Sequence, residues 1–111
     1  MRRSDGELVS DALMHISVLR KHLARGDLED QTVADAVTLR LAAAIEALAN
    51  CSDELRIRAF GEEWPLIWAT RNRIAHGYAY IDMSIVTATV VHDLPWLEDR
   101  LREEAILATD E

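Results

Sequence analysis

Residues 64–76 read Trp-Pro-Leu-Ile-Trp-Ala-Thr-Arg-Asn-Arg-Ile-Ala-His, and their spacing decides the kind of fold that we expect. Apolar residues recur at steps of three and four, which is the period of one face of an α-helix. That stripe also contains a cation, since it consists of Trp64, Ile67, Trp68, Arg71, Ile74 and Ala75. Desolvating a guanidinium costs several kcal/mol unless it meets a counter-charge, a ligand or a wet interface. We therefore expect Arg71 to have a partner.

The same period predicts helices on both sides of this stretch. A first helix should end near Gly26, and a second, capped by Asp27 or Asp30, should end near Asn50. Their stripes are Leu8, Ala12, Ile16, Leu19 and Leu23, and Val33, Val37, Leu41, Ala44 and Leu48. A short helical piece capped by Ser52 or Asp53 should run through Ala59, before a break at Gly61.

Downstream, Asp82 can cap a helix that runs through Leu94, and Pro95 can open a last helix. The interior residues predicted for these helices are Val86, Val90, Leu94, Leu97, Leu101, Ala105 and Ala108. We find no strand-like alternation of useful length and no repeat. The sequence thus predicts an all-α, up-and-down helical bundle of four to five main helices.

Composition indicates one domain, residues 1–111, with a core from about residue 7 to about residue 108. The chain has 111 residues, half of them hydrophobic, and a single cysteine that cannot form an internal disulfide. We see neither a signal peptide nor an apolar run long enough to span a membrane, and expect a cytoplasmic protein. A net charge of −8 argues against broad capture of nucleic acid, so any such contact should be local.

Charge is distributed unevenly along the chain. Residues 64–81 contain no carboxylate although the whole chain has 20, which leaves Arg71, Arg73 and His76 available to an anion. From His92 onwards there are seven carboxylates, which we interpret mostly as a solvated helix face and tail.

Residues 71–78 read Arg-Asn-Arg-Ile-Ala-His-Gly-Tyr, which combines a permanent cation, an imidazole and a phenol. The chemistry that fits is metal-free RNA cleavage, in which the ribose 2′-hydroxyl attacks its phosphate. His76 would transfer the proton and Arg71 would stabilise charge on the phosphate. We expect no metal and no other cofactor, since no ligand motif or Gly-rich phosphate loop occurs.

Each of these residues also has a purely structural interpretation. Arg71 could form an ion pair, for which Glu46 is the candidate, and His76 could interact with the helix dipole. Asn72 could orient the phosphate or bond the backbone, and Arg73 could face solvent or contact RNA. Tyr78 could be a rim residue with a wet hydroxyl. The three tryptophans fit core or dimer packing, and His15 and His22 lack a third metal ligand.

Arg71 and His76 would diverge on one unbroken helix, because residues five apart are rotated by about 140°. A turn at Gly77 loosens that constraint, and a two-fold dimer lets residues of two protomers converge on one cleft. We therefore expect the site at a subunit interface.

The motif Arg71, four residues, His76, one residue, Tyr78 resembles the signature of HEPN-domain ribonucleases, specifically the HepT-like toxins. The flanks agree: Trp64, Trp68, Asn72, Ile45-Glu46-Ala47, Ile81-Asp82 and Leu94-Pro95 resemble that family, and the resemblance extends from about Leu8 to Leu107.

The resemblance implies a homodimeric toxin whose Arg71 and His76 cut RNA at the dimer cleft. It also implies a cognate antitoxin, a minimal nucleotidyltransferase of the MntA type, which silences the toxin by AMPylation of Tyr78. The alternative is a non-catalytic HEPN module that binds a nucleotide or partners a nucleotidyltransferase.

Overall fold

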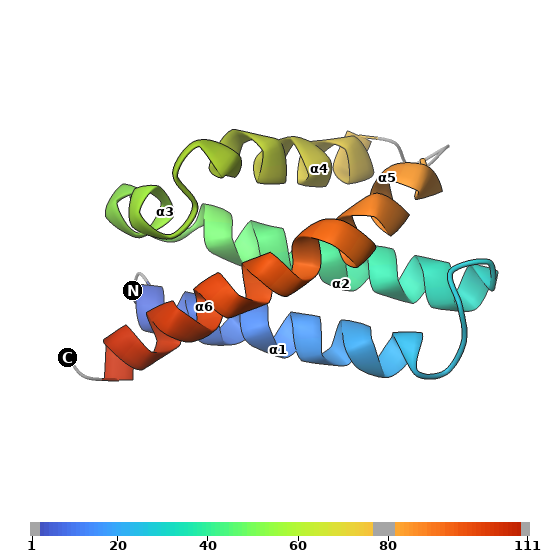
Figure 1. Cartoon of the computed structure of the whole chain (residues 1–111), viewed down its shortest axis with the longest axis horizontal. Coiled ribbons are helices and arrows are strands. Elements are labelled where there is room, and N and C mark those ends of the chain that lie inside the picture. The colour runs from blue at the N-terminus through green and yellow to red at the C-terminus, as the bar shows by residue number, and fades with distance from the viewer. Residues whose placement is uncertain (1–2, 77–81, 110–111) are drawn as a thin grey trace.

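The computed structural model describes residues 3–76 and 82–109, and every regular element in them is helical (Figure 1). The longer helices are α1 (Asp5–Leu23), α2 (Gln31–Ala49), α4 (Trp64–His76) and α6 (Leu94–Thr109). The short helices α3 (Asp53–Phe60) and α5 (Met83–Ala88) connect them. The predicted all-α bundle is confirmed.

The helices begin where short polar side chains accept hydrogen bonds from free backbone N–H groups. Ser4 and Glu7 form a capping box at the start of α1, and Asp30, Ser52 and Asp82 cap α2, α3 and α5. The sequence left open whether Asp27 or Asp30 caps the second helix and whether Ser52 or Asp53 caps the third. The structure has Asp30 and Ser52 as the caps.

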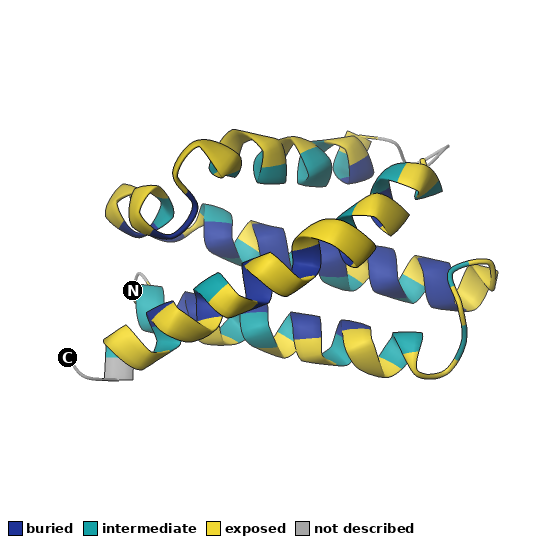
Figure 2. Ribbon diagram, in the orientation of Figure 1, coloured by how far each residue is buried: buried dark blue, intermediate teal, exposed yellow. Residues whose placement is uncertain are grey.

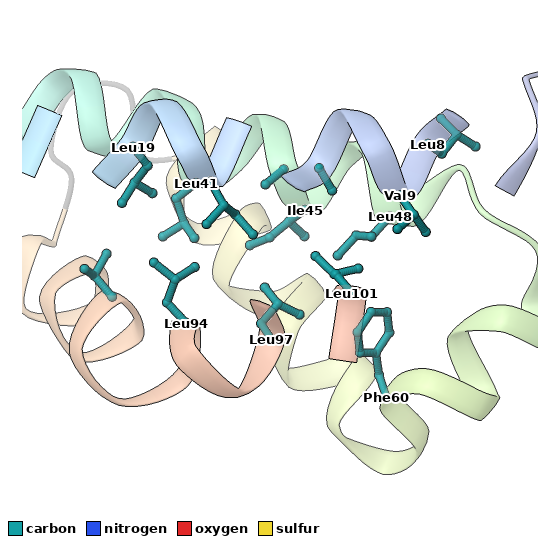
Figure 3. Packing of buried hydrophobic residues seen from close by; sticks show 14 of the residues in the cluster. Leu8, Val9, Leu19, Leu41, Ile45, Leu48, Phe60, Leu94, Leu97 and Leu101 are labelled. Carbon is teal, nitrogen blue, oxygen red and sulfur yellow. The ribbon is translucent and has the colours of Figure 1, made fainter. Parts of the chain in front are cut away.

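α2 is the central helix of the bundle. It packs along α1 on one side and under α4 on the other, while α6 crosses α1 (Figure 1). Figure 2 shows the buried face of each helix turned towards this centre. Leu19, Leu41, Ile45, Leu48 and Leu101, all close to fully buried, come from three helices and meet in one core (Figure 3).

Downstream of Asp82 the chain differs from the two separate helices that we predicted. α5 and α6 are joined without a break by a π-helical turn, Thr89–Asp93, in which the Leu94 N–H donates to the Thr89 carbonyl. Pro95 follows directly and has no N–H to donate. A π turn accommodates such a missing hydrogen bond, which explains why the helix continues here instead of ending.

Two carboxylates of α6 are exceptions to the expected, mostly solvated face of the C-terminal segment, in which Asp93, Asp99 and Glu103 are exposed. Glu98 is buried and pairs with Arg20 of α1, and Glu104 is buried and accepts two hydrogen bonds from Arg58 of α3. Arg100 adds a 2.9 Å hydrogen bond to the Ala59 carbonyl. These contacts fasten α6 to α1 and α3.

No helix in the described part of the chain combines the length and the apolar character that crossing a bilayer requires.

Candidate functional site

The site is built on α4, which starts after a sharp change of chain direction. Gly61 has a φ of +53°, a conformation that favours glycine, and a 3₁₀ turn, Gly61–Glu63, leads into the helix. Ile74 is buried, and Trp64, Ile67 and Trp68 pack against the core. The predicted stripe is thus the inner face of α4, and Arg71 lies on it.

Arg71 faces α2 and contacts three side chains of the described residues. Its Nη2 lies 2.8 Å from Oε2 of Glu46, and its Nη1 donates to Oδ1 of Asn72 at 3.3 Å. Its Cζ lies 4.9 Å from the centre of the Trp68 ring. The Arg71 side chain is 26% exposed and that of Glu46 is 48% exposed, so water reaches the pair. The predicted pairing of Arg71 with Glu46 is present.

A groove of about 430 Å³ runs between α2 and α4 beside this pair. Its walls are largely apolar, and the polar side chains at its ends include Asp35 near one end of α2 and Glu46 near the other. Eleven residues of helix separate these two, about 16 Å along the axis. This distance is long enough for an extended segment of a polymer chain, and Arg71 is the one cation among the described residues that line the groove. Those residues are Asp35, Thr38, Leu39, Ala42, Ala43, Glu46, Arg71, Ile74 and Ala75.

The structure does not bring His76 to Arg71 within one chain. α4 stays helical through His76, which is exposed as its last residue, so the two side chains diverge by about 140°. Arg73 is exposed, as expected, and lines a second groove of about 310 Å³ with Asp93 and Trp96. Gly77, with its predicted turn, and Tyr78 lie outside the described residues.

Sequence reasoning missed the contact between Arg71 and Trp68, because it assigned the tryptophans to packing alone. The signal was present: the two residues are three apart on one helical stripe, where side chains are neighbours. Among the described residues, no group of three His, Cys, Asp or Glu side chains is arranged to hold a metal ion.

An all-helical bundle that presents an Arg-x-x-x-x-His motif on a helix beside a groove defines a HEPN-like protein. Residues 9–104 match the family described as Ribonuclease HepT-like, and the chain therefore belongs to the HepT-like ribonuclease family. Comparison with curated proteins and with solved structures gave no match.

Proposed function

We propose that this protein is a metal-independent endoribonuclease and the toxin of a toxin–antitoxin system. The family match carries the proposal, since it spans most of the chain and includes the motif helix. The surroundings of Arg71 support it: a half-buried, solvent-accessible guanidinium beside an open groove suits a phosphate, which presents the same oxygen acceptors as the Glu46 carboxylate.

The proposed reaction is a transesterification. The ribose 2′-oxygen attacks the adjacent phosphorus while the bond to the 5′-oxygen of the next nucleotide breaks, leaving a 2′,3′-cyclic phosphate and a 5′-hydroxyl. His76 takes the proton of the 2′-hydroxyl, and water protonates the leaving 5′-oxygen. Arg71 stabilises the negative charge that builds up on the phosphate oxygens. Asn72 and Arg73 are candidates for further contacts to the strand.

A homodimer supplies the geometry that one chain lacks. Because Arg71 and His76 diverge on α4, the proposed site combines Arg71 of one protomer with His76 of its partner across a two-fold axis. Mixing Arg71→Ala and His76→Ala proteins tests this directly. One of the two sites in each heterodimer is then intact, so random mixing should restore about a quarter of wild-type activity. A site within one chain would gain nothing from mixing.

Cleavage is tested with purified protein and RNA in the presence of a chelator. Wild type should cut RNA and leave the cyclic phosphate. Arg71→Ala should lower the rate about 10²- to 10³-fold and His76→Ala about 10²- to 10⁴-fold. Arg25→Ala and His92→Ala, which change exposed residues of the same types, should retain activity. Loss of cleavage on chelation would exclude the metal-free mechanism.

The proposed partner is a nucleotidyltransferase antitoxin of the MntA type that transfers AMP to Tyr78. A bulky anionic group two residues from His76 would obstruct the site and compete for Arg71. After co-expression with such an enzyme, intact mass should rise in AMP-sized steps. The Tyr78→Phe variant should lose these steps, and Tyr80→Phe, the matched control, should keep them.

One observation favours a second candidate, a non-catalytic HEPN module that binds a nucleotide or a nucleotidyltransferase. Arg71 is already neutralised by Glu46, as in a purely structural ion pair. If wild type, Arg71→Ala and His76→Ala all leave RNA equally intact while the wild type still binds a nucleotide or the enzyme, this second function is the correct one.

A further inference from the structure

A row of stacked rings connects Arg71 to the hydrophobic core. The ring centres of Phe60 and Trp64 are 5.9 Å apart with an interplanar angle of 27°, and those of Trp64 and Trp68 are 6.1 Å apart at 22°. The guanidinium of Arg71 caps the row over Trp68. Phe60, at the other end, is buried in the core (Figure 3). The row therefore has a rigid base and ends at the motif cation.

A stacked guanidinium keeps its hydrogen-bonding edge available. A guanidinium contacts a ring through its flat face, whereas its N–H donors point outwards in the guanidinium plane, and the Arg71 Cζ lies 4.9 Å from the centre of the Trp68 ring. Two of the three groups around Arg71 use those donors, namely the Glu46 carboxylate at 2.8 Å and the Asn72 amide at 3.3 Å. Trp68 alone among the three leaves the donors free for another acceptor.

We infer that Trp68 is a positioning residue: it holds the guanidinium plane of Arg71 in place while the Glu46 carboxylate is exchanged for a phosphate of RNA. The inference rests on the proposed function, because it assigns a phosphodiester to Arg71. Of the contacts that Arg71 makes with described residues, the long hydrogen bond to Asn72 is the one left when the ring is removed and Glu46 is released, so the guanidinium loses its orientation. With the ring, binding of the phosphate costs little reorganisation of the arginine.

Trp64, the middle ring of the row, also contacts a second arginine. Arg56 lies over Trp64 at 5.4 Å, ion-pairs with Asp53 and donates to the Ala49 carbonyl. That cation is thus occupied by groups of the α2–α3 connection. Trp64 thus packs between Phe60, Trp68 and Arg56. Trp68 is the ring of the row that contacts Arg71.

The first measurement is the affinity for a 2′-O-methyl RNA oligonucleotide, which binds but cannot be cleaved because its 2′-oxygen is blocked. Trp68→Leu should weaken binding about 2- to 30-fold, the range of a cation–π contact, and Trp68→Phe should restore most of the loss. Trp96→Leu is the matched control, since Trp96 packs against Phe60 at the base of the row. Equal affinity of Trp68→Leu and wild type would overturn the inference, and so would an equal loss in Trp96→Leu.

The second measurement does not depend on RNA. In a proton–nitrogen NMR spectrum, the Nε–Hε signal of Arg71, assigned by its absence in Arg71→Lys, should be shifted upfield by the Trp68 ring current. It should move downfield in Trp68→Leu and stay in place in Trp96→Leu. An unchanged signal in a folded Trp68→Leu variant refutes the stacking itself. If wild type neither binds nor cuts RNA while the signal moves as expected, the proposed function fails and the stacking is retained.

Discussion

Removing Arg58 from the Arg58–Glu104 pair should destabilise the protein much more than removing Glu104. The Glu104 side chain is 3% exposed, whereas that of Arg58 is 53% exposed. The carboxylate accepts hydrogen bonds from Arg58 Nε at 3.1 Å and Nη2 at 2.7 Å, its partners among the described residues. The pair joins α3 to α6.

The magnitudes follow from which charge stays buried. Arg58→Met leaves a carboxylate away from water without its counter-charge, and losing one partner of a buried pair costs about 3–5 kcal/mol. Glu104→Leu leaves a guanidinium that water can solvate, and it adds apolar burial, so its cost should stay below about 1 kcal/mol. The double variant Arg58→Met/Glu104→Leu should return close to wild type, because neither charge of this pair remains.

Urea unfolding followed by far-ultraviolet circular dichroism measures all four proteins. A loss of about 3 kcal/mol is a large part of the roughly 5–15 kcal/mol that stabilises a domain. Equal losses in the two single variants, or a double variant as unstable as Arg58→Met, would refute the reasoning.

Further predictions concern the thiol, a histidine and a helix cap. Burial raises the pKa of the Cys51 thiol to about 11, so iodoacetamide should label it about 10²-fold more slowly than a free thiol at pH 8, with labelling accelerated by urea. Partial burial and the nearby Arg40 lower the pKa of His15 below its ordinary 6.5. Folding therefore favours the neutral imidazole of His15. The resulting contribution to the free energy of unfolding is fully present above pH 6.5, and it is lost as the pH falls through the lowered pKa of the folded state. Urea unfolding from about pH 8 to about pH 5 should therefore show a steeper loss for wild type than for His15→Gln. Asp30→Ala removes the acceptor of the Thr32 and Val33 N–H groups and should cost about 1 kcal/mol, whereas Asp27→Ala, which loses one turn contact to Glu29, should cost less in the same assay.

Much of the fold was predictable because helices are specified by nearby residues. The stripe of α2, from Val33 to Leu48, is buried as expected, and Asp82 caps α5. The join between α5 and α6 was not predictable in this way. Pro95 is compatible with a helix start and with a bend, and only the packing of Val90 and Leu94 into the core selects the continuous helix with its π turn.

For the candidate site, local sequence predicted that Arg71 would lie on the inner stripe of its helix, since the helical period determines the direction of each side chain. The roles of Arg71, His76 and Tyr78 in cleavage and modification remain predictions.

What the sequence determined by itself was therefore helical content, most helix ends and the angular position of the motif residues, because these depend on hydrogen bonds and rotations within a few residues. Which charges lose water, and which partners they gain, depends on how the helices pack together. Glu98 and Glu104 read as ordinary surface carboxylates in the sequence, yet both are buried, because α6 crosses the bundle beside Arg20 and Arg58. The cost of burying a charge depends on the groups that distant helices place around it, and a helical period contains no information about those groups.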